Sequence, residues 1–385
     1  MRRIRRVHAG LATMAIAGVL ITAACGSSGG SSSAQAGSAG GGSGKYTALL
    51  KTSSQMIPSQ YEGPTAPAKA PRGIKIAAIT CYSILEGCVI PAEGIAKAAA
   101  DIGWTERTYD GGGTPTTQNA QILNAVSWGA KVIALIAITP SAVQTGLAAA
   151  KKAGALIVSG SSGLSSPNPT VAAPSGDIWP AFDVSPNYGK LGQNLGSWII
   201  GDSNGKADVA VYGDKEFDSI NAQQAGIVPT LHGCGGCKIS PVMYFSATQI
   251  SSALGPEVVS YLRTNPSVNY IYGAYDPPTV AMVTAIQNAG LANQVKIASA
   301  LGNSQNLHLV ASGQVEAADA AYDNTYMGFA MVDQSIRLLD HLPLFQPLGE
   351  NLPFQVLTKA NLPGNLKSWT APFNYQAQFV KLWKG

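Results

Sequence analysis

Residues 121–160, "QILNAVSWGAKVIALIAITPSAVQTGLAAAKKAGALIVSG", alternate two kinds of segment. The runs "KVIALIAI" (131–138) and "ALIVSG" (155–160) are short, apolar and rich in β-branched residues, which is typical of buried strands. Stretches with the apolar spacing of an amphipathic helix precede each run. This order predicts repeated β-α units, in which the strands are parallel and helices cover the sheet.

The same alternation continues on both sides of this block. The other strand-like runs are "IKIAAIT" (74–80), "TERTYD" (105–110), "ADVAVYG" (207–213), "KISPVMYF" (238–245), "VNYIYGAY" (268–275) and "VKIASAL" (295–301). Helical spacing is found at 91–104, where Pro91 is expected at the helix start, and at 218–231, 251–264 and 277–290. The pattern predicts an α/β protein with two doubly wound parallel-sheet lobes.

Composition restricts the function classes. The chain has 385 residues, and the 314 that follow residue 71 are enough for two lobes with separate cores. Four of the 25 basic residues lie within the first eight, so the remainder balances the 21 acidic residues. Without a basic run, nucleic acid is not expected as a partner.

The N-terminus has the pattern of a secretory signal. "MRRIRRVH" is basic, and residues 9–24 are uncharged and end in small side chains. This apolar run falls short of the ~20 residues of a membrane-spanning helix. We therefore expect a signal peptide over 1–24, with an uncut membrane anchor as the alternative.

The segment Ala23-Ala24-Cys25-Gly26 resembles the lipobox of bacterial lipoproteins, although Thr22 stands where that family prefers Leu. The resemblance implies a lipid on the sulfur of Cys25 and anchoring to the membrane; plain secretion is the alternative. Residues 25–71 are then expected to be a flexible Gly/Ser- and Pro-rich tether. Within it, "TALLKTSSQMI" (47–57) is compatible with a short helix.

Four cysteines follow Cys25, and an even number in an exported chain favours disulfides. The short spacings suggest the pairs Cys81–Cys88 and Cys234–Cys237. The second pair is a CxxC, for which redox and zinc roles are alternatives. A reactive CxxC sits at a helix N-terminus, whereas this one follows a predicted helix and precedes a strand. A structural disulfide is therefore favoured.

"IKIAAIT…GIAKAAADIGW", the 121–160 block and "YIYGAYDPPTVAMVTAIQNAGL" (270–291) together resemble the type I periplasmic binding proteins of ABC importers, in the ribose-binding-like branch. The resemblance implies a three-strand hinge with crossovers near Asp183, Tyr322 and Leu344. It divides the chain into an N-terminal lobe (72–183 and 323–344) and a C-terminal lobe (184–322 and 345–385).

The implied function is an extracytoplasmic solute-binding lipoprotein. Such a protein is a monomer that captures a sugar or a sugar-like molecule between its lobes and delivers it to an ABC transporter permease. The alternative is a cell-surface ligand-sensing or interaction module of the same fold without a transport role.

Ligands of open parallel sheets bind beyond the carboxyl ends of the strands. Aromatic rings cover the C–H faces of a polyol, and hydroxyl, amide and carboxylate groups pair with its hydroxyls. The candidate ligand-binding residues that follow the predicted strands are Tyr82, Ser83, Ser159, Ser161, Asp183, Phe217, Asn221, Phe245, Tyr275, Asp276, Asn303 and Tyr322.

Several of these positions depart from the ribose-binding pattern. Gly160-Ser161 replaces the family's Asp-Arg pair, and Leu301 stands where the family has an acidic residue. Tyr275 and Tyr322 replace an Asn and a Gln. These departures argue against a small, fully polar monosaccharide and leave room for a larger, less polar or aromatic-bearing ligand. The tyrosines could instead pack within a lobe. Asp276 could instead be the N-cap of a helix, and Asp183 could instead support the backbone of the hinge.

Neither catalysis nor a cofactor or metal is predicted. The four histidines are scattered, and no nucleophile elbow, Walker loop or metal-binding helix is present. "DGGGTP" (110–115) lacks the GxGxxG spacing and is expected to be a loop. A transcription repressor of this fold would need a DNA-binding head, and the signal and tether occupy that end.

Overall fold

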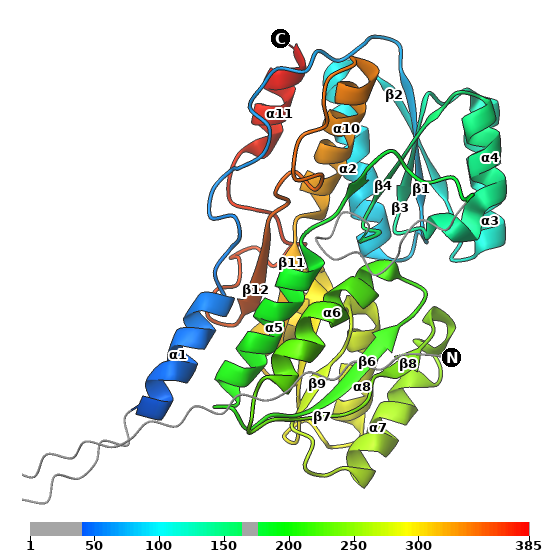
Figure 1. The fold of residues 1–385 in the computed structure, drawn as a ribbon. Coiled ribbons are helices and arrows are strands. Elements are labelled where there is room, and N and C mark those ends of the chain that lie inside the picture. The colour runs from blue at the N-terminus through cyan, green and yellow to red at the C-terminus, as the bar shows by residue number, and fades with distance from the viewer. Residues whose placement is uncertain (1–40, 164–175, 385) are drawn as a thin grey trace, which may run out of the picture. The chain divides into compact units, whose positions relative to one another are not determined.

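The computed structural model describes residues 41–163 and 176–384. The predicted signal peptide and Cys25 lie outside these residues. Two sheets organise the fold (Figure 1). The predicted α/β class, with parallel strands and covering helices, is confirmed. Among the described residues no helix is long and apolar enough to cross a bilayer.

The first sheet has the strand order β2-β1-β3-β4-β5, and every pair in it is parallel. Its strands are β1 Lys75–Thr80, β2 Thr105–Asp110, β3 Val132–Ile136, β4 Leu156–Gly160 and β5 Asp183–Val184. The helices that cover it are α2 Glu86–Ile102, α3 Pro115–Trp128, α4 Gln144–Lys152 and α10 Asn324–Leu339. Both faces are buried: Ile76 and Ala78 of β1 face a core shared with α2 and α10, while Ala77 and Ile79 face α3 and α4. This explains the continuously apolar strands.

The second sheet has the order β12-β11-β10-β9-β6-β7, with β8 also paired to β6 and only β12 antiparallel. Its strands are β6 Asp208–Asp214, β7 Lys238–Ile239, β8 Met243–Phe245, β9 Tyr270–Tyr272, β10 Lys296–Leu301, β11 Glu316–Tyr322 and β12 Phe354–Thr358. Its helices are α5 Tyr188–Asp202, α6 Asp218–His232, α7 Leu254–Thr264, α8 Asp276–Asn288 and α9 Ser304–Ser312. The helices α5 and α6 pack together, as do α7 and α8.

Two details of the predicted elements are wrong. The run "KISPVMYF" is divided into β7 and β8, because Ser240 and Pro241 interrupt the ladder between them. Pro91 does not begin its helix but lies inside α2, which starts at Glu86. The missing N–H of Pro91 falls on the second turn, where the helix loses one backbone hydrogen bond.

The chain passes between the two sheets three times: from β5 to α5, from β11 to α10, and from α10 to β12. The last helix, α11 Tyr375–Lys384, packs against α10 and α2 (Figure 1). This helix was expected in the C-terminal lobe, and its contacts correct that assignment. Its buried Trp383 stacks on Phe329 of α10 and on Phe379, and the ring of Phe379 is tilted against that of Phe329.

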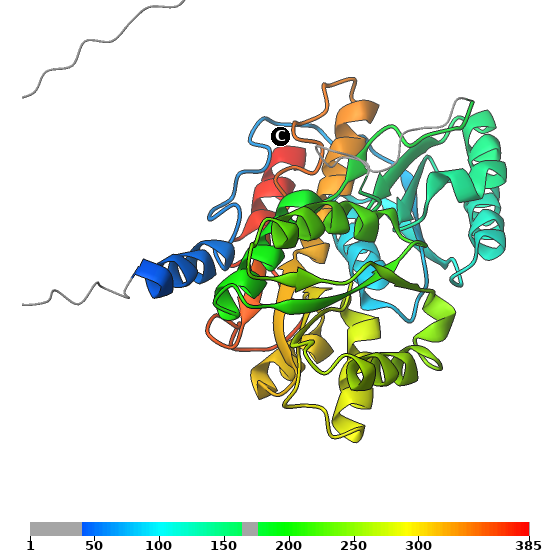
Figure 2. The ribbon, with the colours of Figure 1, turned by 60° about the horizontal axis from the view of Figure 1, so that its bottom comes forward.

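Residues 41–71 are not a flexible tether, contrary to expectation. The helix α1 Gly41–Ser53 packs on α5, which Figure 2 shows from a second direction. Ile57 then forms an antiparallel bridge with Phe354, and the amides of Ala68 and Ala70 donate to carbonyls of α11. We call residues 41–71 the strap. Its apolar side chains and these backbone hydrogen bonds explain why it is held against the protein.

Candidate ligand-binding site

Two adjoining cavities lie at the carboxyl ends of strands from both sheets. The inner cavity has a volume of about 40 Å³ and is lined by Cys81, Leu85, Gly87, Cys88, Ala137, Ser161, Phe217, Ser219, Ile220, Tyr275, Pro277, Leu301 and Tyr322. The outer cavity, of about 330 Å³, is lined by Cys81, Tyr82, Leu85, Gly113, Pro115, Gln118, Ala137, Ile138, Thr139, Ala142, Lys215, Glu216, Phe217 and Ala247. The two share Cys81, Leu85, Ala137 and Phe217. The outer volume falls within the roughly 300–1,000 Å³ of small-molecule sites.

Other cavities fit a ligand site less well. One of about 190 Å³ lies where the strap meets the segments 185–187 and 347–354. Another, of about 500 Å³, lies at the amino ends of β3 and β4, beside Trp179. The first touches the carboxyl end of the edge strand β5 alone and is otherwise lined mostly by strap and loop residues, and the second lies at the amino ends of its strands. Neither is formed by the carboxyl ends of several strands, beyond which ligands of this architecture bind. The paired cavities are therefore the candidate site.

Unusual backbone conformations mark the strand ends at this site. Ala137 after β3, Ser161 after β4 and Ala274 after β9 have φ values of 51°, 58° and 66°, and Leu301 at the end of β10 has a φ of 136°. Non-glycine residues rarely adopt positive φ, and each instance costs about 1–3 kcal/mol. Three of the four residues line the inner cavity. Such strain concentrates at functional sites.

Aromatic side chains from the second sheet form one wall. Tyr275 lies edge-on to Phe217, with 5.7 Å between ring centroids, and stacks on Phe245 at 6.1 Å. Its hydroxyl donates a hydrogen bond of 2.8 Å to Oδ2 of Asp214. Burial raises the pKa of Asp214 to about 6, and the hydrogen bonds from the Glu216 amide and from Tyr275 oppose this rise. Burial, and then Asp214, hold the pKa of Tyr275 well above its ordinary value, so the phenol stays neutral.

Tyrosine hydroxyls also connect the two sheets. The hydroxyl of Tyr188, in the first turn of α5, lies 2.9 Å from Oγ of Ser161 and donates to the hydroxyl of Tyr322 over 3.4 Å. Tyr188 and Tyr322 pack edge to face. Burial raises the pKa of Tyr322 to about 12 and that of Tyr188 well above its ordinary value. Both therefore remain neutral hydrogen-bonding groups.

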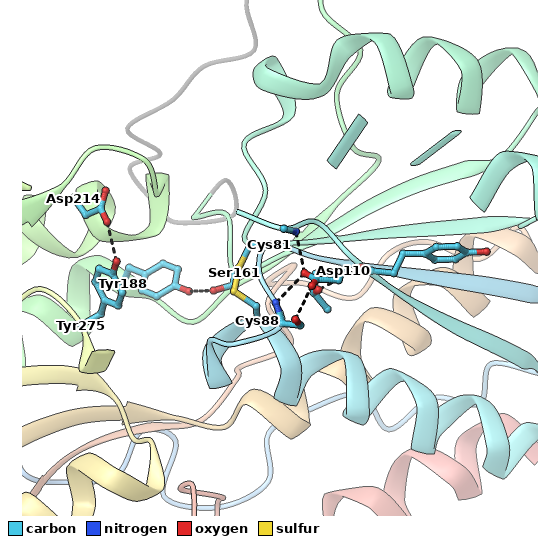
Figure 3. Close-up of a disulfide and its surroundings, with 11 residues drawn as sticks. Cys81, Cys88, Asp110, Ser161, Tyr188, Asp214 and Tyr275 are labelled. Atoms are coloured by element: carbon cyan, nitrogen blue, oxygen red, sulfur yellow. Dashed lines mark hydrogen bonds between the residues drawn. A yellow bond between two sulfur atoms is a disulfide. The ribbon is translucent and has the colours of Figure 1, made fainter. Parts of the chain in front are cut away.

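A disulfide forms the opposite wall (Figure 3). Cys81 and Cys88 are bonded, with their Cα atoms 5.6 Å apart, and join the end of β1 to the first turn of α2. Asp110 holds the adjoining loop, because its carboxylate accepts from the amide and hydroxyl of Ser83 and from the amide of Gly112. These bonds, that from the Ser83 hydroxyl foremost, lower the pKa of Asp110.

A direct hydrogen bond joins the two sides of the site near the outer cavity. The hydroxyl of Thr139, after β3, donates to Oδ2 of Asp218 at the start of α6 over 3.3 Å. Deeper in the site, a Cβ placed on Gly87 of α2 would lie 3.2 Å from Cδ1 of Leu301. The two halves of the site are thus in contact at its rim and at its base.

Three buried carboxyls lie beneath the second sheet's part of the site. One ligand oxygen from each of Asp276, Glu316 and Asp319 lies within 4.8 Å of the others, and all three side chains are fully buried. Donors reach them from Ser299, Asn306 and the amides of Gly302 and Asn303. Burial raises all three pKa values, that of Asp319 to about 7. We call this set the carboxyl cluster; its raised pKa values favour protonation of part of it.

A family model for the periplasmic binding protein domain matches residues 88–342, well over half of the chain. The chain belongs to the periplasmic binding protein family. No curated protein matches it significantly in sequence. Members of this family act outside the cytoplasm and bind solutes, so this binding protein is not an enzyme.

Solved structures agree with the family. The binding protein is similar to an ABC sugar transporter subunit from Rhodobacter sphaeroides (TM-score 0.63, 18% identity, covering 75% of this chain and 99% of that one). It is also similar to a solute-binding protein from Agrobacterium vitis with bound α-D-tagatopyranose (TM-score 0.65, 15% identity, covering 77% of this chain and 100% of that one). A third similar structure is a solute-binding protein from Burkholderia graminis with D-arabinose (TM-score 0.63, 18% identity, covering 77% of this chain and 98% of that one). The fold is that of type I periplasmic binding proteins.

Five of the predicted ligand-binding residues line the paired cavities. Ser161, Phe217, Tyr275 and Tyr322 line the inner one, and Tyr82 and Phe217 line the outer one. Their role in ligand binding stays a prediction.

The other seven candidates do not line either cavity. Ser83 is exposed and bonded to Asp110, and Asn221 lies on α6. The remaining five are Ser159, Asp183, Phe245, Asp276 and Asn303, which are buried in contacts with protein groups.

Two of the alternative roles are resolved by these contacts. Asp276 is not an N-cap, because Tyr275 holds that position and Oδ2 of Asp276 accepts from the amide of Asn303. Asp183 supports the crossover: its carboxylate accepts from the hydroxyls of Ser159 and Ser185, at 2.6 and 2.7 Å.

Sequence reasoning missed most of the apolar lining, including Leu85, Ala137 and Ile220. Residues of this kind at strand ends look like core residues. It also missed Tyr188, which lies at a helix start rather than after a strand. The one signal in the sequence that could have identified Ala137 is its position after a strand, because Ala137 directly follows β3 as Ser161 directly follows β4.

Proposed function

We propose that this binding protein captures a small molecule of sugar-like size between its two sheets and delivers it to the permease of an ABC importer. One observation carries the proposal: the paired cavities take their walls from the carboxyl ends of strands in both sheets. The sugar ligands of the Agrobacterium and Burkholderia proteins support the ligand class.

The three crossovers support a hinge mechanism. Closing the lobes around a ligand removes it from water and brings groups from both sheets onto it. Neither wall alone encloses the site, so the closed form is selected by the ligand. The permease then distinguishes loaded from empty protein by lobe orientation.

Binding and closure are tested together. A thermal-shift screen of sugars, polyols and aromatic acids identifies ligands, and calorimetric titration confirms them. Small-angle scattering of the saturated protein should show a smaller radius of gyration than that of the free protein. A screen without a ligand would reject the solute-binding role, and unchanged scattering would reject closure.

Anchoring through Cys25 completes the proposal. The support is the lipobox-like sequence and the polar stretch 26–40 that separates it from α1. Replacing Cys25 with Ser should move the protein from the membrane fraction to the soluble extracytoplasmic fraction. Retention in the membrane fraction would reject lipidation.

A further inference from the structure

The inner cavity has an unusual lining for a site that holds a polyol. Its walls are the Cys81–Cys88 disulfide, aliphatic side chains, a proline and aromatic rings, and within residues 41–163 and 176–384 no lining residue is Asp, Glu, Lys, Arg or His. The polar lining groups are two serine hydroxyls and two tyrosine hydroxyls. A sugar buries several hydroxyls that each need a partner. The walls of the inner cavity provide few such hydrogen-bond partners.

The carboxylates near this cavity already have protein donors. Asp214 accepts from Tyr275 and from the amide of Glu216, and Asp218 accepts from Thr139. Asp183 accepts from two serine hydroxyls. Oδ2 of Asp276 accepts from the Asn303 amide, while its buried Oδ1 has no hydrogen-bond partner among the described residues and lies in the carboxyl cluster. A carboxylate bonded in this way has less capacity to receive hydroxyls from a ligand.

The charged side chains that line the outer cavity, Lys215 and Glu216, also have partners within the protein. The ammonium group of Lys215 lies over the ring of Tyr244, 4.2 Å from its centroid, and Oε2 of Glu216 accepts from the amide of Ala247. The outer cavity keeps neutral polar groups, notably Gln118 and Thr139, beside the ring of Tyr82. The outer cavity therefore offers side chains that can hydrogen-bond to a ligand, whereas the inner cavity offers mainly apolar surface.

From this division, and resting on the proposed function, we propose that the ligand is uncharged and partly deoxygenated. Its apolar end, a methyl or short alkyl group, enters the inner cavity between Leu301, Tyr275 and the disulfide, and its hydroxyls remain in the outer cavity. The inner volume of about 40 Å³ suits a group of that size. Deoxy sugars and O-alkyl glycosides have this chemistry.

The selectivity follows from the cost of an unpaired hydroxyl. A ligand that differs only by carrying –CH₂OH in place of –CH₃ would place its oxygen against Leu301 and the sulfur pair. An apolar pocket rejects an added hydroxyl by up to about 100-fold. A carboxylate at the same position meets no cationic side chain among the described lining residues of the inner cavity and is rejected more strongly.

Calorimetric titration with sugars matched at one carbon tests the proposal. The probes are D-fucose, D-galactose and D-galacturonate, which carry –CH₃, –CH₂OH and –COO⁻ at C6, and L-rhamnose against L-mannose. In at least one set, the deoxy member should bind 10- to 100-fold more tightly than its hydroxylated partner, and galacturonate should bind most weakly. Equal or tighter binding of the hydroxylated or charged members, or no binding of either deoxy sugar, overturns the inference.

A substitution separates this result from a failure of the proposed function. Leu301→Asn supplies a donor and an acceptor to the inner wall, so the deoxy preference should shrink at least 10-fold. Leu123→Asn, at a half-exposed position on α3, is the matched control and should leave the preference unchanged. An unchanged preference in Leu301→Asn, with a native melt, overturns the assignment. If the broad screen instead finds a charged or fully hydroxylated ligand, the inference fails and the solute-binding role stands.

Discussion

The hydroxyl of Tyr275 donates to the buried carboxylate of Asp214 across 2.8 Å, while the ring of Tyr275 faces the inner cavity. One side chain thus supports the end of β6 and forms part of the candidate site. Burial raises the pKa of Asp214 to about 6, so at neutral pH the carboxylate is mostly ionised and depends on this donor. The two roles of Tyr275 are separable by substitution.

Removing the ring of Tyr275 should weaken ligand binding, whereas removing its hydroxyl should mainly affect stability. For Tyr275→Ala we expect a loss of about 1–3 kcal/mol of binding, or roughly 5- to 150-fold in affinity. Tyr275→Phe should retain affinity within a few-fold and lower the melting temperature more at pH 7.5 than at pH 5, where a larger fraction of Asp214 is protonated. Titration and thermal melts of both variants measure this.

The same ring truncation at Tyr82 and Tyr322 tests their predicted roles. A tyrosine that only packs would lower the melting temperature while leaving the affinity of folded molecules unchanged. If Tyr82→Ala, Tyr275→Ala and Tyr322→Ala all bind as the unmodified protein does, the paired cavities are not the binding site.

The carboxyl cluster should make stability depend on pH. Asp319 has a pKa of about 7 in the folded state and about 3.9 when unfolded. Between these values the folded state holds a proton that the unfolded state has released, so the free energy of unfolding falls as the pH rises. Asp276 and Glu316, also raised by burial, extend the fall in the same direction. We expect the melting temperature to fall from pH 5 to pH 8.

Asp319→Asn should flatten this profile, since the amide stays neutral throughout. The matched control is Asp340→Asn at an exposed position after α10. An Asp319→Asn profile as steep as that of the unmodified protein would show that the cluster does not cause the pH dependence.

Close helix packing predicts a large effect of a single methyl group. The helices α2 and α10 approach through glycines: a Cβ on Gly94 would lie 2.6 Å from the carbonyl oxygen of Thr325, and one on Gly328 would overlap the carbonyl oxygen of Pro91. Gly328→Ala should therefore lower the free energy of unfolding by about 1–3 kcal/mol, despite the better helix propensity of alanine. Gly235→Ala, with no neighbouring atom within 4 Å, is the control in denaturant titrations.

The two disulfides should differ in what their removal changes. Cys81 and Cys88 line the inner cavity, whereas Cys234–Cys237 lies between α6 and β7. Replacing either pair with Ser should cost less than the ~3 kcal/mol that chain entropy gives for closing a 15-residue loop, because both loops are shorter. Only the Cys81/Cys88 double variant should also lose affinity for the ligand from the screen. Equal affinity losses in both double variants would contradict the placement of the site.

The fold was predictable because strand and helix patterns are local. The apolar runs over 74–80 and 131–138 became β1 and β3, and both disulfide pairings are present. Within the strap, a short helix was predictable and is present as α1, but the ordered course of 41–71 was not, because Gly-rich and Pro-rich sequence lacks a periodic apolar face. Its order comes from contacts with α5, β12 and α11, which lie far away in the sequence.

The site was predictable in position but only partly in composition. The carboxyl-end rule selects strand ends, yet it does not say whether a side chain turns toward the cleft or back into the lobe. Tyr275 and Asp276 are adjacent, and the first lines the inner cavity while the second joins the carboxyl cluster. The chain turns at Ala274, whose φ is 66°, and passes from the extended Tyr275 into α8 at Asp276; the sequence alone gives no sign of this turn.

Amide hydrogen exchange, with and without a saturating ligand from the screen, tests the central claim most directly. We expect slower exchange on binding in segments of both sheets that surround the paired cavities, namely 81–88, 137–139, 217–220 and 274–277. Segments far from the cavities, such as the Cys234–Cys237 loop, should exchange at the same rate in both states. Protection confined to one sheet, or found instead around the cavity beside the strap, would contradict capture of the ligand between the two sheets.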